Sequence, residues 1–414
     1  MNRRDFLRIT GTSGIGLPLY SGAFLFENGF KAEYMRRKVK ITDVKTTVIK
    51  GNFQWPIFKI ETDQGIFGLG ESCVGPEIPT LVQSIKHLII GEDPLGIDYL
   101  WTRMMSSMSG YGGSAGSIVI AISGIELALW DLAGKILEVP SYKLLGGKFR
   151  DKVRVYCDSH GSEIPDPQRW KERALEVKEK KFDVYKFDID SITKASPWSK
   201  NLSRTISVEE LKKMVAVIEA VREVLPPPVD LAVDCHWAYD ERDALRFAQA
   251  MEPFNLLWLE DPTPPENPEA MARVTAGTKT PICTGENLYT RHGFRPFIEG
   301  NACDIVQPDI ARCGGLLESK RIAELADIYY MPFSGHNVCS PVGTIACAHV
   351  CTAIRDFLAL EFHGVDVPWW EDVVVYGKPI IKDGYIILSD KPGFGIELND
   401  EVCKTHIVEG VSYF

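Results

Sequence analysis

Short β-rich runs recur along the chain from Val153 onward, and stretches with helical spacing of apolar residues separate them. The runs are VRVYCD, DVYKFDI, VDLAVDC, LLWLED, PICTGE, DIVQPD, YMPFSG and FLALEF. The stretches between them include VEELKKMVAVIEAVREVL and ESKRIAELADI. Eight strands that alternate with helices predict an α/β fold with a parallel barrel, over residues 148–364.

The preceding part of the chain has a different pattern. Residues 40–75 alternate apolar and polar positions around the turn sequence Asp63-Gln64-Gly65, which predicts a hairpin or a small antiparallel meander. Apolar residues at helical spacing follow over residues 117–137, and Pro140 ends that pattern. Together these features predict an α+β domain over residues 40–147.

The first thirty residues resemble an export signal. Arg3 and Arg4 lie in the sequence NRRDFLR, and a weakly apolar stretch broken by Gly, Ser, Thr and Pro follows. This pattern predicts a twin-arginine signal over residues 1–30 and a periplasmic or exported protein, or a cytoplasmic one if the signal does not function. The alternative is a basic amphipathic arm or a disordered tail.

Composition excludes several classes of protein. The 414 residues carry a net charge of −10, so the clustered Lys and Arg that a nucleic-acid partner requires are lacking. The most apolar window, residues 117–133, is interrupted by Glu126 and Asp131, so we expect no membrane span. Ten cysteines without a CxxC pair are expected to be buried apolar residues rather than zinc ligands or disulfides.

Chemically active residues stand at or just after the ends of six successive strand runs. They are separated by 26, 26, 23, 27 and 25 residues, about one strand-helix unit each, and are Asp234, Glu260, Glu286, Asp309, His336 and Glu361. A strand-end acid can be a helix N-cap or a solvated loop residue. Six residues in phase are better explained by convergence on one mouth of the barrel.

Three of these carboxylates predict a bound cation. Asp234, Glu260 and Glu286 repel one another strongly at close range, so we expect a divalent ion between them. Oxygen ligands from separate elements favour Mg2+, with Mn2+ as the next choice. Asp309 and His336 follow on adjacent strands, where a carboxylate can orient an imidazole as a general base.

Several motifs resemble the mandelate racemase subgroup of the enolase superfamily. They are WLEDP, the GEN that follows PICT, QPDIARCGGLLESKRIAELA and ALWDLAGKILEVPSYKLLGG, and the resemblance extends over roughly residues 40 to 400. It implies a modified (β/α)7β barrel under a capping domain, to which we expect residues 365–414 to return. It also implies that the three carboxylates bind the metal, that Asp309 and His336 form a dyad, and that Glu361 hydrogen-bonds near the enediolate.

The second and third strands distinguish this chain within that family. Members commonly carry a base at the last lysine of a Lys-x-Lys motif, but here Lys186 is followed by Asp188, which implies a one-base reaction. His236 lies two residues after Asp234, as in galactonate-type sugar acid dehydratases, where the matching histidine protonates the leaving hydroxyl. The alternatives are a backbone-bonded loop role for His236 and, for Lys186, an ion pair with Asp188 instead of a charge near the substrate carboxylate.

The resemblance therefore predicts a metal-dependent hydro-lyase that converts a small-molecule sugar acid to a 2-keto-3-deoxy acid. A cycloisomerase or epimerase acting through the same enediolate is the alternative, as is a sugar-acid binding protein without catalysis. We expect selectivity to lie in residues 51–55, 104–113 and the insertion at 191–207, which contains Trp198. We also expect a homo-oligomer.

Overall fold

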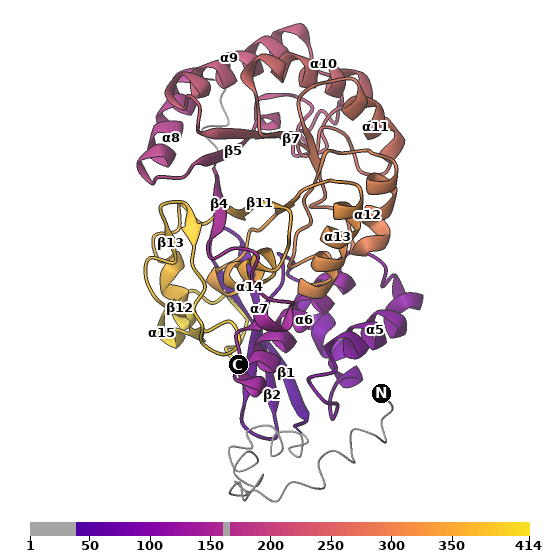
Figure 1. The fold of residues 1–414 in the computed structure, drawn as a ribbon, viewed down its shortest axis with the longest axis vertical. Coiled ribbons are helices and arrows are strands. Elements are labelled where there is room, and N and C mark those ends of the chain that lie inside the picture. The colour runs from indigo at the N-terminus through magenta and orange to yellow at the C-terminus, as the bar shows by residue number, and fades with distance from the viewer. Residues whose placement is uncertain (1–38, 160–165) are drawn as a thin grey trace, which may run out of the picture. The chain divides into compact units, whose positions relative to one another are not determined.

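The barrel and the domain before it are seen in a computed structural model, which describes residues 39–159 and 166–414. The twin-arginine pattern, with the signal expected over residues 1–30, lies outside the described residues. Within the described chain, an antiparallel sheet with helices precedes a ring of strands surrounded by helices (Figure 1).

Eight parallel strands form the barrel, and it closes because β11 pairs with β4 as well as with β10. Seven helices alternate with the strands, which confirms the predicted (β/α)7β arrangement. In order, the elements are β4 (Val153–Asp158), α8 (Pro167–Glu179), β5 (Val184–Asp188), α9 (Val208–Val224), β6 (Asp230–Asp234), α10 (Glu241–Met251), β7 (Trp258–Glu260), α11 (Pro268–Ala276), β8 (Ile282–Thr284), α12 (Thr290–Glu299), β9 (Ile305–Val306), α13 (Leu316–Ile328), β10 (Phe333–Gly335), α14 (Pro341–Thr352) and β11 (Phe357–Phe362).

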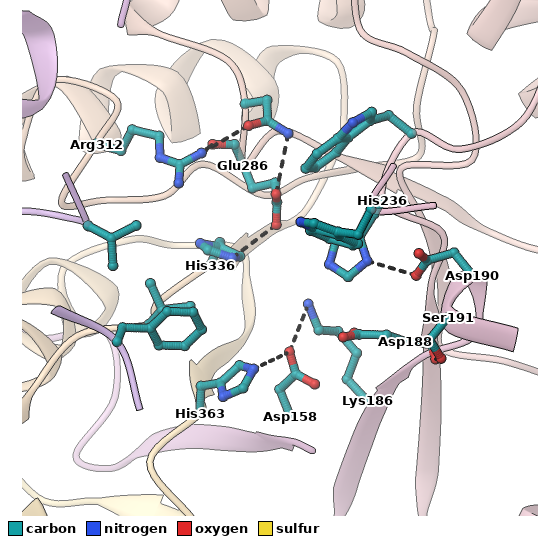
Figure 2. A pocket seen from close by; sticks show the side chains of 16 residues that line it. Asp158, Lys186, Asp188, Asp190, Ser191, His236, Glu286, Arg312, His336 and His363 are labelled. Atoms are coloured by element: carbon teal, nitrogen blue, oxygen red, sulfur yellow. Dashed lines mark hydrogen bonds and ion pairs between the residues drawn. The ribbon is translucent and has the colours of Figure 1, made fainter. Parts of the chain in front are cut away.

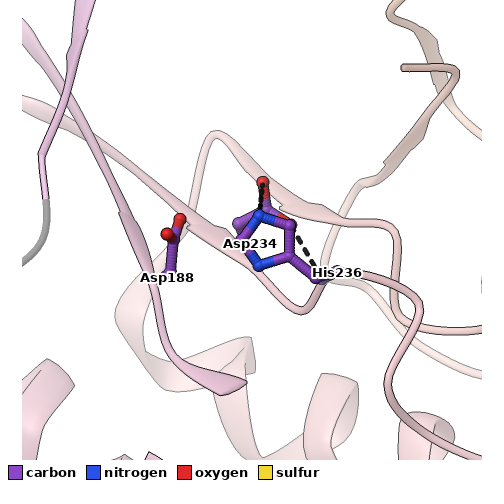
Figure 3. A group of neighbouring side chains, drawn as sticks. All are labelled: Asp188, Asp234 and His236. Carbon is purple, nitrogen blue, oxygen red and sulfur yellow. Dashed lines mark hydrogen bonds and ion pairs between the residues drawn. The ribbon is translucent and has the colours of Figure 1, made fainter. Parts of the chain in front are cut away.

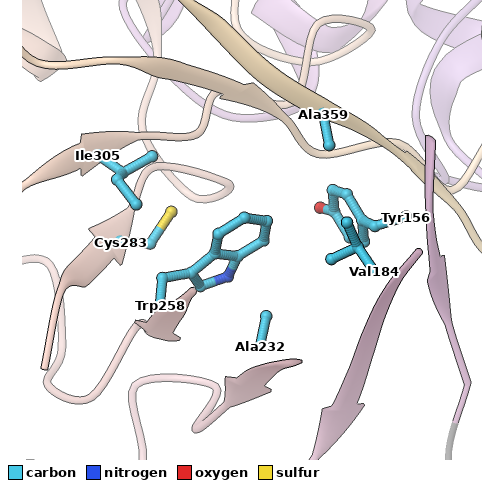
Figure 4. Close-up of a cluster of buried hydrophobic side chains, with 7 residues drawn as sticks. All are labelled: Tyr156, Val184, Ala232, Trp258, Cys283, Ile305 and Ala359. Carbon is cyan, nitrogen blue, oxygen red and sulfur yellow. The ribbon is translucent and has the colours of Figure 1, made fainter. Parts of the chain in front are cut away.

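A layer of buried apolar side chains fills the interior of the barrel (Figure 4). One residue comes from each of seven strands: Tyr156, Val184, Ala232, Trp258, Cys283, Ile305 and Ala359. The indole of Trp258 packs edge-on against the ring of Tyr156 with centroids 5.3 Å apart. The small residues Ala232 and Ala359 leave room for these two large rings, so the interior is closed and supports the mouth above it.

The capping domain is built on three antiparallel strands in the order β1 (Ile41–Lys50), β2 (Gln54–Thr62) and β3 (Phe67–Glu71), as the alternation predicted. The turn between β2 and β3 contains Gly65 with a φ of +73°, a conformation that favours glycine. Helix α6 packs against β3 so closely that a Cβ on Gly68 would lie 2.1 Å from the carbonyl oxygen of Ala128. The helices are α4 (Ile78–Ile85), α5 (Ile97–Met108), α6 (Ser117–Leu137) and α7 (Ser141–Leu144).

The C-terminal segment contacts both the barrel and the capping sheet. Strand β14 (Tyr385–Ile386) pairs antiparallel with β4 and with β13 (Ile381–Lys382), while Ile407 forms a bridge to Ile49 in β1. Its remaining elements are β12 (Val374–Val375), β15 (Glu397–Leu398) and α15 (Asp400–Thr405). The segment therefore fastens the cap to the first barrel strand.

The expectation for the cysteines agrees with the structure. All ten cysteines are free and buried, as expected for small apolar core residues. Among the described residues, only α6 is long and apolar enough to cross a membrane, and most of it is buried inside the protein. It is the central helix of the capping domain.

Candidate active site

Charged side chains form the layer of the barrel immediately above its apolar core. Residues two apart on a strand point to the same face, so each core residue places the residue two positions later at the mouth. On five strands the core residue is thus followed, two positions later, by a charged residue. The pairs are Tyr156 and Asp158, Val184 and Lys186, Ala232 and Asp234, Trp258 and Glu260, and Ala359 and Glu361; all five charged residues are buried. The apolar layer and the charged layer are thus consequences of one strand register.

Asp234, Glu260 and Glu286 form a candidate divalent metal site. Each offers a carboxylate oxygen, and these oxygens lie within 4.8 Å of one another. Asp234 and Glu260 are neighbours in the β6–β7 register, and all three residues are buried. Burial and the nearby Asp234 carboxylate raise the pKa of Glu260 well above its ordinary value, because crowded carboxylates without a cation favour protonation. A hard divalent cation fits this all-oxygen donor set.

Lys186 lies beneath the mouth among four carboxylates. Its Nζ is 2.9 Å from both Asp234 and Glu260, 3.0 Å from Glu361 and 3.3 Å from Asp158. Burial opposes its charge, but these carboxylates together raise its pKa well above the ordinary value. The ammonium therefore neutralises part of the carboxylate cluster, and its ion pairs are with these four residues rather than with Asp188, the partner considered from sequence.

Asp309 and His336 are hydrogen-bonded, and both are buried. The His336 Nδ1 atom lies 2.9 Å from Asp309 Oδ2, while its Nε2 atom is 3.0 Å from Glu286 and 3.5 Å from Glu361. Burial disfavours the imidazolium, but these carboxylates raise the pKa of His336. In turn His336 lowers the pKa of Glu286 to about 2, against the effect of burial. Asp309 thus orients a ring whose other nitrogen faces the cavity (Figure 2).

His236 approaches the same cavity from β6, four strands away from β10 and so on the opposite side of the barrel. Its Nδ1 is 2.9 Å from Asp190 (Figure 2), and its Nε2 is 3.9 Å from Asp234 (Figure 3). Its φ is +44° and that of Trp237 is +50°, the left-handed region that is costly for non-glycine residues. The strained turn directs the imidazole back over the carboxylate cluster.

A second arrangement of potential ligands adjoins the first. Atoms of Asp188, Asp234 and His236 also lie within 4.8 Å of one another. Asp188 and His236 are only half-buried, whereas the all-carboxylate group is fully buried. The latter donor set is therefore the better match for a hard cation.

The cavity over these residues has a volume of about 520 Å3 and is lined from both domains (Figure 2). The capping domain contributes Phe53 and Val74. The barrel lines the rest with Asp158, Lys186, Asp188, Asp190, Ser191, Trp198, His236, Trp237, Glu286, Asn287, Arg312, His336, Val338 and His363. This mixture of ionisable and aromatic groups suits a small polar ligand.

The three segments expected to set selectivity have different positions. Phe53 lines the cavity, but Trp55 is buried and donates from Nε1 to the carbonyl of Val338 at 3.0 Å. The insertion contributes Ser191 and Trp198. Residues 104–113 instead border a neighbouring cavity of about 590 Å3, which shares Asn287 with the first, so their part in selectivity stays a prediction.

Sequence reasoning missed several cavity residues, of which Arg312 and His363 are the most informative. Arg312 Nη1 donates to the Glu286 carbonyl at 3.0 Å and to Asn287 Oδ1 at 2.9 Å. His363 lies two residues after Glu361, with its Nε2 atom 3.7 Å from Asp158, and Asn52 donates to its carbonyl at 2.7 Å. His363 could have been found from the sequence, because it lies two residues after Glu361 and strand alternation places both side chains on the same face. The position of Arg312 depends on the conformation of a loop, which the sequence pattern does not show.

Two family descriptions match successive parts of the chain. Residues 34–146 match the mandelate racemase / muconate lactonizing enzyme N-terminal domain, and residues 169–402 match the enolase C-terminal domain-like family. The second match alone covers more than half of the chain. These two matches correspond to the cap and most of the barrel.

Full-length relatives agree with these matches. A D-xylonate dehydratase of Haloferax volcanii is 42% identical over 91% of this chain and 91% of its own. A D-galactonate dehydratase of Variovorax paradoxus is 32% identical over 84% and 90%. A crystal structure of a mandelate racemase/muconate lactonizing enzyme-like protein from Rubrobacter xylanophilus, 43% identical, superimposes with a TM-score of 0.87 over 91% of this chain and 100% of that one.

Proposed function

The chain belongs to the enolase superfamily, in its mandelate racemase and muconate lactonizing enzyme branch, and on this premise we propose that it dehydrates a linear sugar acid. The product is the corresponding 2-keto-3-deoxy acid. One observation carries the proposal: a buried carboxylate triad, an Asp–His dyad and a second histidine all adjoin one cavity.

Asp234, Glu260 and Glu286 are the residues that hold the divalent cation, with Mg2+ as the proposed ion and Mn2+ as the alternative. When bound, the cation neutralises charge on the substrate carboxylate and on the enediolate. Lys186 lines the cavity and is the further positive charge that we assign to the region of the substrate carboxylate. Glu361 forms an ion pair with Lys186 at 3.0 Å and so helps to keep that ammonium in place.

His336 removes the proton from the carbon next to the carboxylate. Its Nδ1 atom is bonded to Asp309, so the Nε2 atom is the one that receives the proton. The electron pair of the broken C–H bond forms the enediolate, and Asp309 stabilises the resulting imidazolium. Because β5 carries Asp188 where the racemases carry a second lysine, only one base of this kind is assigned.

His236 donates the proton that the leaving hydroxyl requires. As the enediolate collapses, the C3–O bond breaks, the proton of His236 goes to that oxygen, and water departs. The remaining enol takes up a proton at C3, loses the proton of its C2 hydroxyl and becomes the 2-keto acid. Asp190 lies 2.9 Å from Nδ1 of His236, which leaves Nε2 as the atom that gives up the proton.

The substrate is proposed to carry one carboxylate and a polyol chain, and D-xylonate is the first compound to test because the 42%-identical relative is named for it. Arg312 is the other permanently charged cation on the cavity wall among the described residues. Its Nη atoms are already directed to the Glu286 carbonyl, to Asn287 and to Cys73.

The test is conversion of D-xylonate, with D-galactonate and other sugar acids in parallel, followed by detection of the 2-keto product. Chelation should abolish turnover and Mg2+ should restore it. Glu260→Gln should remain folded and lose activity because it removes one charged ligand. Turnover in metal-free buffer, or no 2-keto product from any acid in the panel, contradicts the proposal.

We also propose that residues 1–30 act as a twin-arginine export signal, as the sequence pattern suggests. In a bacterial host, the wild-type protein should be found outside the inner membrane. Replacement of Arg3 and Arg4 by lysine keeps the charge and should retain the protein in the cytoplasm. An equal distribution of both proteins contradicts the export proposal.

A further inference from the structure

Two buried carboxylates of the capping domain play no part in the proposed chemistry. Glu71 is the last residue of β3, and Glu126 lies in the middle of α6. Their relative exposures are 0% and 1%. A buried carboxylate is costly unless several donors face it, so the identity of those donors indicates what each residue does.

Glu71 binds the first turn of α14, the helix that follows His336. Its Oε1 accepts from the main-chain nitrogen of Ser340 at 2.8 Å, and its Oε2 accepts from that of Gly343, also at 2.8 Å. The Ser340 hydroxyl donates to Oε2 as well. These main-chain groups have no acceptor within their own helix, so an acid from the cap satisfies them and complements the helix dipole.

Glu126 makes the corresponding contact with α13, the helix that follows Asp309. Its carboxylate accepts from the main-chain nitrogens of Leu316 at 2.8 Å and Leu317 at 3.0 Å. The indole nitrogen of Trp130, one turn further along α6, donates to it at 2.5 Å. Both members of the Asp309–His336 pair are therefore followed by a helix whose start is bound to a carboxylate of the cap.

Glycines make room for both carboxylates. A Cβ built on Gly315 would lie 2.1 Å from Oε2 of Glu126, and its φ of +95° also favours glycine. A Cβ on Gly343 would lie 3.1 Å from Oε2 of Glu71 and 2.6 Å from Cβ of Cys339. The barrel loops are thus shaped to admit these two side chains.

Tryptophans of the cap bind the same two segments at other points. Trp55 donates to the carbonyl of Val338, two residues after His336, at 3.0 Å. Trp101 donates to the carbonyl of Gly314, five residues after Asp309, at 2.9 Å. Side chains of the capping domain consequently hold each of the short stretches between the dyad and the helices at two or more places.

We propose that Glu71 and Glu126 are positioning residues that fix the two segments carrying His336 and Asp309, so that the seated capping domain sets the geometry of the base. This role rests on the proposed function, in which His336 abstracts the proton. A general base needs its nitrogen within hydrogen-bonding reach of that proton, and an error of about 1 Å can cost about 100-fold in rate.

The experiment compares Glu71→Gln and Glu126→Gln with Asp131→Asn in the Mg2+-loaded enzyme at pH 8. The pKa of each glutamate is about 7, so both are ionised at that pH, and glutamine keeps the size but loses one acceptor oxygen. Asp131 is the matched control, since it is a buried acid of α6 that accepts from main-chain nitrogens of Leu69 and Phe394. None of its contacts involves the segments that follow Asp309 or His336.

We expect kcat for exchange of the α proton of D-xylonate with deuterated solvent to fall about 10- to 100-fold in the two glutamate variants, with KM within about twofold. Asp131→Asn should lose thermal stability but keep kcat within about twofold. If the glutamate variants lose no more kcat than the control at equal loss of stability, the positioning role is excluded.

A second readout does not depend on catalysis. In nitrogen-15 spectra of the histidine rings, the His336 signal, assigned through its loss in His336→Asn, should shift in both glutamate variants and stay unchanged in Asp131→Asn. An unchanged signal in both overturns the inference even if wild-type enzyme does not act on D-xylonate, an outcome that would contradict only the proposed function. If Glu71→Gln does not fold, Trp55→Phe removes the hydrogen bond to the Val338 carbonyl while keeping an aromatic ring, and it should give the same shift.

Discussion

His336 lies on a segment that is buried throughout and bound by the barrel, the cap and the C-terminal segment, whereas His236 lies on a strained turn beside an exposed insertion. Asn337 donates to Glu361 at 2.8 Å, and Trp370 donates to the carbonyl of Cys339 at 3.2 Å. On the other side, Trp198 is 69% exposed, and its ring packs edge-on against His236 with centroids 4.7 Å apart. The proposed base is held by a rigid frame, and the proposed acid is held by a few local contacts.

This difference matches what the two proton transfers require. Abstraction of a proton next to a carboxylate is the more difficult step, and it demands a base in one place. Loss of a hydroxyl is assisted by an acid that must reach an oxygen whose position varies with the configuration of the sugar acid. We therefore expect substitutions near His236 to change substrate specificity with less loss of activity than substitutions near His336.

The largest expected effect comes from removing the base. His336→Asn should lower both dehydration and α-proton exchange by about 1,000-fold or more, because no other imidazole is oriented by Asp309. Exchange is measured by proton NMR in deuterated solvent, and dehydration by the 2-keto product. Wild-type dehydration in this variant would move the base to Lys186 or Asp188 and favour the cycloisomerase alternative.

Removal of the acid should have a smaller and more selective effect. His236→Asn should slow dehydration about 100-fold, the scale of a lost general acid, while α-proton exchange at His336 continues. The ratio of exchange to dehydration, measured in one sample, should therefore rise relative to wild type. Equal loss of both activities would show that the two sides of the cavity do not act independently.

The fold and the candidate metal site could be predicted from the sequence because each follows from a regular spacing of residues along the chain. The one-unit spacing from Asp234 to Glu361 follows from the barrel, and alternation along a strand brings every second residue to the mouth. When a site residue lies on a strand or directly after it, the alternation of the strand's own residues shows which way its side chain points.

Residues whose role depends on distant partners could not be found in this way. Glu71 and Ser340 are 269 positions apart, and Glu126 and Leu316 are 190 apart, so no local pattern connects them. Trp55 was expected near the substrate because it lies beside the loop that contains Phe53. The Trp55 indole instead points into the protein interior, where it donates a hydrogen bond to the carbonyl of Val338.

The insertion at residues 191–207 offers a test of the His236 side of the cavity, which fewer contacts hold in place. Trp198→Ala should raise KM for the sugar acid about fivefold and leave the thermal midpoint unchanged, since one aromatic contact contributes about 1 kcal/mol and the ring is mostly exposed. Leu202→Ala is the matched control, because Leu202 is 79% exposed in the same insertion and does not line the cavity. A drop in the thermal midpoint of Trp198→Ala would show that this side is more firmly packed than its exposure suggests.

The smallest expected effect concerns how the stability of the protein depends on pH through Glu71 and Glu126, the acids that hold the His336 side of the cavity. Burial raises the pKa of both Glu71 and Glu126 from 4.5 to about 7, although the surrounding donors oppose this. Between these values the folded protein holds protons that the unfolded chain has released, so the free energy of unfolding falls as pH rises from about 4.5 to about 7 and then levels off.

Glutamine does not titrate, so Glu71→Gln and Glu126→Gln should each lose less stability than wild type between about pH 5 and pH 8. In thermal unfolding, this difference should amount to a few degrees in the midpoint. The same pH dependence in wild type and both variants would mean that the two carboxyls keep their ordinary pKa and bind α13 and α14 as ions over the whole range.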